Sequence, residues 1–168
     1  AMSGTTNSLI EFTNYLRNGN PTGACEHSTF LQAKYKQTIK ELYTKEEFAK
    51  AATDKVNEVF EHLRDLARKP LTVDVEKEIV AQGEIMSTNM VTYYMQEQGI
   101  DAVLLNSLEF MRLDENGEPD LAYIRTHIRP LLDAEATSRI YIAQGFICLN
   151  AARKDKEGNL KSNIVPFI

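Results

Sequence analysis

Two short apolar runs, each of which follows a helical segment, constrain the fold of this chain most strongly. Residues 102–105 read AVLL, and residues 139–144 read RIYIAQ. Runs of this kind are typical of strands buried in a parallel sheet, because helices cover both faces of such a sheet. A helix followed by a short strand, repeated along the chain, predicts an α/β fold with a mostly parallel sheet.

Helical patterns fill much of the first half of the chain. A first helix ends at residues 18–21, and residues 26–43 predict a second, weakly patterned helix. Thr44 begins a third helix, with Glu47 three residues later as a capping box requires, and residues 68–70 end it. Apolar positions recur at helical steps of three and four: Leu9, Phe12 and Leu16 in the first helix, and Phe48, Ala52, Val56, Val59, Leu63 and Leu66 in the third.

The second half of the chain mixes helix and strand. Residues 73–98 predict a helix interrupted at Gln82 and Gly83, and Gly99 is its expected C-terminal stop. Four more segments follow: an extended one at 109–113, a turn at 114–117, a helix at 121–132 and a polar, turn-rich excursion at 154–163. Two or three strands beside five or six helices predict a helix-rich chain with an incomplete sheet.

Composition excludes several classes of function. With 24 acidic and 19 basic residues the formal net charge is -5, which argues against sequence-independent binding of nucleic acid. The two cysteines and three histidines are scattered without metal-ligand spacing, so we expect two free thiols and no metal site. No apolar run approaches the roughly 20 residues of a membrane helix, and no signal peptide opens the chain. We therefore expect a cytoplasmic protein without a membrane partner.

Three segments carry residue types from which ligand sites are built. Residues 1–7 read AMSGTTN ahead of a helix, where backbone N–H groups attract anions and a glycine permits close approach. Residues 83–88 read GEIMST, in which the Glu84 carboxylate could pair with a ligand ammonium group. Residues 144–147 read QGFI at the carboxyl end of a strand, where open α/β sheets bind ligands.

Each segment also has a purely structural interpretation. The hydroxyls of residues 1–7 could form an N-cap cluster, and Glu84 could merely favour a helix dipole. Residues 144–147 could be a turn with a buried Phe146. The spacing of each segment by itself leaves both interpretations open.

In their order and rough spacing the three segments together resemble those of aspartate kinases, which belong to the amino acid kinase superfamily. That family's glycine loop reads SAMSGTTN, and Ala1 to Asn7 fit it without a gap, although Ala1 ahead of Met2 could also be a tag remnant. Its GExxST signature matches residues 83–88, and its TQGFI strand matches residues 143–147 with Ala143 in place of Thr. The resemblance extends to about Leu160.

The resemblance implies a fold and an activity. Aspartate kinases transfer the γ-phosphoryl group of ATP, with Mg²⁺, to the side-chain carboxylate of L-aspartate, the first step toward lysine, threonine and methionine. The family's KFGGTS stretch would precede residue 1, and its LxRGGSDYT stretch does not follow the QGFI strand, where residues 159–168 read NLKSNIVPFI. Residues 1–168 are thus expected to form a single domain: the substrate-binding part of the catalytic domain, with a partial amino acid kinase fold and without the first strand, the nucleotide-binding part or the ACT domains.

The resemblance also implies which residues bind substrate. They are Ser3, Gly4, Thr6, Glu84 and Phe146. Thr6 would donate to a substrate oxygen, Glu84 would accept from the ammonium group, and Phe146 would form a wall of the pocket. No catalytic residue and no metal ligand is assigned, and no ATP or Mg²⁺ is expected on this chain. Because the family's cationic groups come from the other segments, and one such group can be worth about 10³-fold, we expect the chain alone to be inactive.

Two other functions stay open at this stage. The chain could be a non-catalytic binding or interaction module that pairs with a complete kinase, or it could belong to a related glutamate or carbamate kinase. The combination of GExxST with QGFI favours aspartate kinase over those relatives. We also expect a homo-oligomer, because strands with uncovered edges and apolar faces self-associate. The residues concerned are Val103, Leu104, Ile140 and Ile142.

Overall fold

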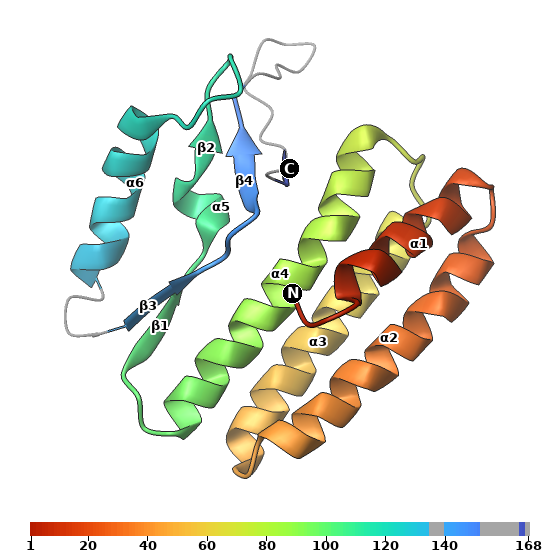
Figure 1. The fold of residues 1–168 in the computed structure, drawn as a ribbon, viewed down its shortest axis with the longest axis horizontal. Coiled ribbons are helices and arrows are strands. Elements are labelled where there is room, and N and C mark those ends of the chain that lie inside the picture. The colour runs from red at the N-terminus through yellow and green to blue at the C-terminus, as the bar shows by residue number, and fades with distance from the viewer. Residues whose placement is uncertain (135–139, 152–164, 167–168) are drawn as a thin grey trace.

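A layer of helices, which includes the three longest, lies beside a smaller layer of strands and two further helices (Figure 1). The computed structural model describes residues 1–134, 140–151 and 165–166. The helical layer contains α1 (Thr5–Arg17), α2 (Pro21–Leu42), α3 (Glu46–Leu66) and α4 (Val73–Glu97). The second layer contains β1 (Ala102–Leu105), α5 (Ser107–Phe110), β2 (Arg112–Leu113), α6 (Leu121–Ala134), β3 (Ile140–Ala143), β4 (Ile147–Asn150) and β5 (Val165–Pro166).

The strands form two small sheets that are mostly parallel. β1 pairs with β3 in parallel, with Ala102 opposite Ile140. β2 pairs with β4 in parallel, and β4 pairs with β5 in the antiparallel direction. The helix-rich α/β class and the mostly parallel pairing that the sequence predicts are therefore confirmed.

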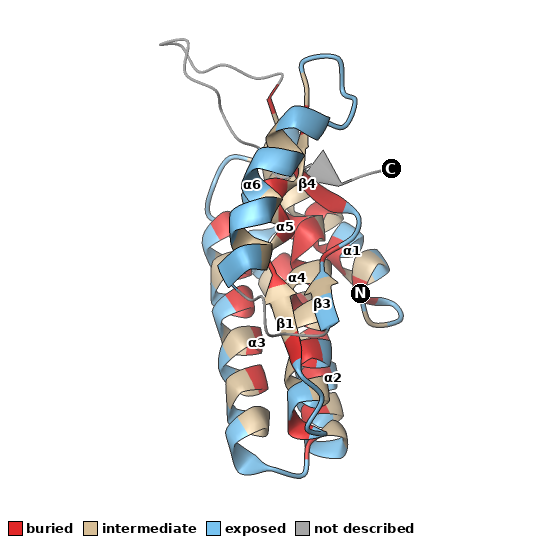
Figure 2. Ribbon diagram, turned by 90° about the vertical axis from the view of Figure 1, so that its left-hand side faces the viewer, coloured by how far each residue is buried: buried red, intermediate tan, exposed pale blue. Residues whose placement is uncertain are grey.

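The core lies inside the helical layer. Its largest fully buried side chains include Leu9, Phe12, Tyr35, Phe60, Leu63, Leu66, Ile79 and Met86. Figure 2 shows buried positions on the inner faces of these helices and exposed positions on their outer faces. The steps of three and four in α3 explain this division, because they put its apolar side chains on one face of the helix. No helix in the described part of the chain is both long and apolar enough to cross a membrane.

The start of α3 differs from the predicted capping box. Lys45, not Thr44, is the N-cap residue, and its side chain makes no capping hydrogen bond to the helix. Instead, Glu97 at the end of α4 accepts the backbone N–H groups of Thr44 at 2.8 Å and Lys45 at 2.6 Å. The capping-box prediction is wrong because a carboxylate that is distant in sequence satisfies these donors.

The predicted interruption of α4 is also wrong. The helix runs without a break through Gln82 and Gly83 to Glu97, and Gly99, with φ 73°, follows its end as expected. A Cβ atom on Gly83 would lie 3.0 Å from Thr5 Cγ2 and 3.4 Å from Leu9 Cδ1. The glycine therefore permits close packing of α1 on α4, which offsets its cost of about 1 kcal/mol within a helix.

Predictions for the second layer are confirmed in part. β1 and α6 lie where expected, but the segment at 109–113 contains the end of the one-turn helix α5 as well as β2. β3 was expected to be buried, yet Ile140 and Tyr141 are each 39% exposed, because β3 pairs with β1 alone within the described residues. Asp114 accepts the N–H groups of Asn116 and Glu118 and so forms the predicted turn. The excursion at 154–163 lies outside the described residues.

Candidate functional site

The loop ahead of α1 is held by backbone geometry and by one lysine. Gly4 is the N-cap residue, with a φ of 79° that disfavours any side chain, and α1 has no side-chain cap. Lys34 on α2 donates from Nζ to the Ser3 carbonyl oxygen at 2.5 Å. Because no hydroxyl caps the helix, an N-cap cluster does not explain this serine- and threonine-rich loop.

The two threonines that open α1 face different surroundings. Thr5 is fully buried, and its hydroxyl is hydrogen-bonded to the Tyr35 hydroxyl at 3.0 Å. Burial raises the pKa of Tyr35, and the negative charge of Glu84 raises it further, against the lowering effect of the Thr5 hydrogen bond. Thr5 is thus occupied within the protein, whereas Thr6 lines a cavity on the other side of the helix start.

Glu84 lies in the middle of α4, so a favourable interaction with the helix dipole does not explain it. Its carboxylate accepts a hydrogen bond from the Ala1 ammonium group at 2.8 Å, and its side chain is 21% exposed. A ligand ammonium group that paired with Glu84 would have to compete with Ala1 for this carboxylate.

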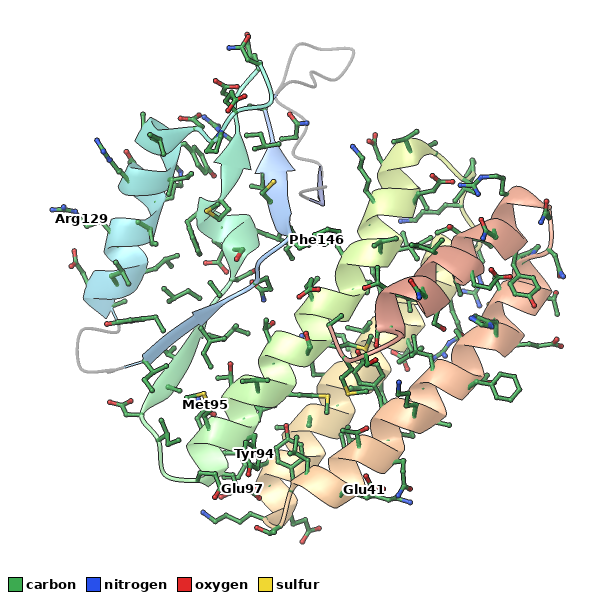
Figure 3. The ribbon with its side chains drawn as sticks, viewed as in Figure 1. Glu41, Tyr94, Met95, Glu97, Arg129 and Phe146 are labelled. Carbon is green, nitrogen blue, oxygen red and sulfur yellow. The ribbon has the colours of Figure 1, made fainter. Side chains whose placement is uncertain are left out.

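Phe146 stands between β3 and β4, on the side that faces α4 (Figure 3). It is the one non-glycine residue with a positive φ, 68°, in the described part of the chain. Its side chain is 37% exposed, so the interpretation of this segment as a turn with a buried phenylalanine is wrong. Its neighbour Gln144 is buried instead, and the Gln144 side-chain oxygen accepts the N–H group of Ser107 at 2.7 Å.

Thr6 and Phe146, far apart in sequence, line one cavity of about 440 Å³ between α1, α4 and the segment that follows β3. Its full lining is Thr6, Ile10, Thr13, Arg17, Val73, Glu76, Lys77, Val80 and Phe146. Glu84 is not part of this lining, but it follows Val80 by one helical turn on α4. Ser3 and Gly4 lie in the loop before α1 and do not line the cavity either.

Three charged residues of the cavity were missed by the sequence analysis: Arg17, Glu76 and Lys77. Arg17 donates from Nη2 to Glu76 Oε1 at 2.5 Å and from Nη1 to Asn14 Oδ1 at 2.7 Å. A continuous helical periodicity through residues 73–98 would have placed Lys77, Val80 and Glu84 on one face. The interruption expected at Gly83 concealed that spacing.

The described residues offer no metal site. Across residues 1–134, 140–151 and 165–166, no three His, Cys, Asp or Glu side chains are grouped so that they could hold a metal ion. The Cys148 thiol is fully buried, and this burial raises its pKa to about 11. A thiol with such a pKa is protonated at neutral pH and is a poor nucleophile.

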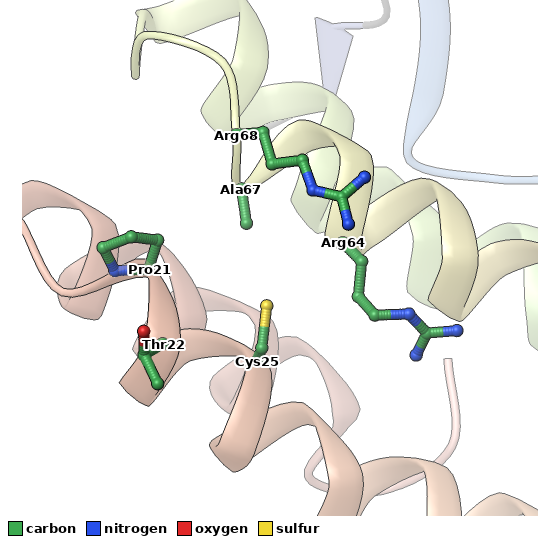
Figure 4. A pocket seen from close by; sticks show the side chains of 6 residues that line it. All are labelled: Pro21, Thr22, Cys25, Arg64, Ala67 and Arg68. Carbon is green, nitrogen blue, oxygen red and sulfur yellow. The ribbon is translucent and has the colours of Figure 1, made fainter.

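A second cavity, of about 290 Å³, opens between α2 and the end of α3 (Figure 4). It is lined by Pro21, Thr22, Cys25, Arg64, Ala67 and Arg68. None of the residues proposed from the sequence lies in it. The cavity beside Thr6 and Phe146 is therefore the stronger candidate for a functional site.

Comparisons with known proteins agree with this fold. No family model and no curated protein sequence matches the chain. The structure is similar to E. coli aspartokinase III in complex with aspartate and ADP (TM-score 0.71) and to the same enzyme in complex with lysine and aspartate (TM-score 0.73). In both cases the identity is 20%, and the match covers 99% of this chain and 35% of the other.

Clostridium acetobutylicum aspartate kinase is similar too, with a TM-score of 0.64 and 15% identity over 96% of this chain and 30% of the other. The chain thus spans about a third of the length of the solved aspartokinases that it matches. Its structure has the fold of one part of an aspartokinase.

Proposed function

We propose that residues 1–168 form a single domain that binds L-aspartate, as the substrate-binding part of an aspartate kinase catalytic domain. The observation that carries this proposal is the convergence of Thr6 and Phe146 on one cavity, next to the α4 turn that bears Glu84. Convergence of distant polar and aromatic residues is what a ligand site requires. The similarity to aspartokinases solved with aspartate supports the choice of ligand.

The chemistry of the reaction fits these residue types. The side-chain carboxylate of aspartate has an unperturbed pKa of about 3.9, so it is already ionised at neutral pH and needs no general base. Catalysis of phosphoryl transfer then consists mainly of positioning and charge stabilisation. Thr6 would orient a substrate oxygen, Glu84 would hold the ammonium group, and the Phe146 ring would limit access of water.

None of the proposed site residues is assigned to the nucleotide half of the reaction. E. coli aspartokinase III was solved with ADP, and among the described residues of this chain no three His, Cys, Asp or Glu side chains are grouped so that they could hold a metal ion. The proposal assigns the site residues of this chain to the amino acid alone. The expectation that the chain by itself transfers no phosphate stays a prediction, which a coupled assay with aspartate and Mg-ATP tests.

Calorimetric titration with L-aspartate tests the proposed function. We expect binding that Glu84→Gln weakens about 10-fold or more, because a hydrogen bond to a charged group contributes about 1.5–3 kcal/mol. Glu61→Gln, an exposed glutamate on α3, is the matched control and should leave the affinity unchanged. Succinate, which lacks the ammonium group, should bind the wild-type chain more weakly than aspartate does.

Two results would contradict the proposal. One is the absence of any L-aspartate binding at millimolar concentrations by a chain that is shown to be folded. The other is equal weakening by Glu84→Gln and Glu61→Gln, which would indicate a general effect of charge.

An interaction module remains the second candidate, because Ile140 and Tyr141 are exposed on β3. A module of this kind would associate with a complete aspartate kinase without binding aspartate itself. Co-sedimentation with such an enzyme, compared with the aspartate titration, separates the two functions.

A further inference from the structure

Lys77 is a cation in the cavity without a partner among the residues that the structure places. It stands on α4, is partly buried, and lines the same cavity as Thr6 and Phe146. Within the described ranges, its Nζ atom makes no hydrogen bond and no ion pair. Phe146, which follows β3 in the second layer, lines the same cavity, so the Lys77 side chain lies on the side of α4 that faces this layer.

Arg17, the other cation of the cavity, is differently placed. Its guanidinium group is engaged by Glu76 and Asn14, and the ion pair with Glu76 neutralises its charge. A ligand carboxylate that approached Arg17 would have to compete with Glu76. Lys77 therefore offers the cavity the more available positive charge.

We propose that Lys77 binds a carboxylate of the substrate and so selects a dicarboxylic amino acid over a neutral one. This inference rests on the proposed function, because it assigns a specificity-determining residue to the same site. In this arrangement the ligand ammonium group takes the place of Ala1 at Glu84, and a carboxylate at the other end of the ligand binds Lys77. Thr6 and Phe146 lie at the cavity that Lys77 lines and contact the ligand there.

The spacing along α4 is compatible with this arrangement. Lys77 and Glu84 are separated by two helical turns on one face, a rise of about 10 Å. Two hydrogen bonds of about 3 Å each, together with the four-carbon skeleton of aspartate, have a total length of this order. The flexible stem of a lysine allows its ammonium group to adjust to the position of the ligand.

The decisive experiment compares the affinities of L-aspartate and L-asparagine for the wild-type chain and for Lys77→Met. We expect Lys77→Met to weaken aspartate binding about 10-fold or more, and to leave asparagine binding nearly unchanged. Lys77→Arg, which keeps the charge, should retain most of the aspartate affinity. Lys36→Met, at an exposed lysine on α2, is the matched control, and a thermal melt of each variant verifies that it is folded.

A second probe separates failure of this inference from failure of the proposed function. Succinate carries the carboxylates without the ammonium group, and its binding can be followed through the backbone NMR signal of Phe146. If aspartate does not bind but succinate shifts this signal in the wild type and not in Lys77→Met, the aspartate function fails and the carboxylate site at Lys77 stands. If aspartate binds equally well to the wild type and to Lys77→Met, Lys77 has no such role although the proposed function survives. If neither aspartate nor succinate binds, both proposals are wrong.

Discussion

Phe146 combines an unfavourable backbone conformation with a position at the cavity. Its φ of 68° lies in the left-handed region, which costs a non-glycine residue about 1–2 kcal/mol. Strain of this kind tends to occur at ligand sites, where the surrounding structure compensates for it. Phe146 lines the cavity together with Thr6 and Lys77, and its ring can limit the access of water there.

Replacement of Phe146 tests this conformation through the sign of a stability difference. Glycine adopts a positive φ without strain, so Phe146→Gly should be more stable to urea than Phe146→Ala by about 1 kcal/mol. The control is Phe30 on α2, 76% exposed, where Phe30→Gly should be less stable than Phe30→Ala by about 1 kcal/mol. If Phe146→Gly were less stable than Phe146→Ala, as expected for the variants at Phe30, the backbone at Phe146 would not be strained.

At the scale of residues, the motifs predicted two of the residues that line the cavity and missed others. Thr6 and Phe146 could be named because their segments together resemble those of aspartate kinases. Lys77 could not, because one lysine on a helix of mixed composition has no distinctive sequence context. Its significance arises only when α4 is packed beside α1 and the segment after β3.

At the scale of elements, Glu97 joins the end of α4 to the start of α3. Figure 3 shows Glu97 at the end of α4, beside the connection from α2 to α3. Its side chain accepts N–H groups of Thr44 and Lys45, and Lys45 Nζ donates to the Glu97 carbonyl oxygen at 2.9 Å. The hydrogen bond from the Lys45 N–H group is the main reason why the pKa of Glu97 lies below its ordinary value, and the hydrogen bonds from Thr44 lower it further.

This contact predicts how stability depends on pH. Because the folded-state pKa of Glu97 is below the unfolded one, its contribution is complete above the unfolded value of about 4.3 and is lost as the pH falls through the folded-state pKa. We expect Glu97→Gln to be less stable than the wild type in urea at pH 7, and the difference to shrink below about pH 4. The control Glu58→Gln, whose exposed carboxylate pairs only with Lys55 among the described residues, should show a much smaller difference at pH 7. A difference for Glu97→Gln that does not change with pH would contradict the assignment.

The elements themselves divide into those that periodicity predicts and those that distant contacts determine. Apolar steps of three and four predicted α3 well, because its inner face packs against other helices. The cap of α3 could not be predicted, since Glu97 is more than fifty positions away. Likewise, the local sequence at Gly83 predicts a break in the helix. Only the close approach of Thr5 and Leu9 explains why a glycine lies inside a continuous helix.

At the scale of the whole molecule, the sheet of β1 and β3 is small and partly uncovered. It contains two strands within the described residues, and two-stranded sheets have marginal stability without further packing. Ile100, Ile140 and Tyr141 are exposed at this sheet, while Val103, Leu104 and Ile142 are partly buried. Apolar side chains gathered on one surface are typical of an interface between proteins.

We therefore expect the chain to form a homodimer or a larger homo-oligomer through the β1–β3 sheet. A second copy would cover Ile140 and Tyr141 and could pair with a strand edge of this sheet, which within the described residues consists of β1 and β3 alone. Such pairing supplies both apolar contact and backbone hydrogen bonds. Light scattering at micromolar concentration should give a mass above the 19.0 kDa of one chain. Replacement of both Ile140 and Tyr141 by lysine should lower the mass to that of a single chain, because two charges would have to be buried in the interface. Phe30→Lys, on α2, should leave the oligomer intact. A wild-type mass of one chain would contradict the expectation, and dissociation by Phe30→Lys alone would place the interface on the helical layer instead.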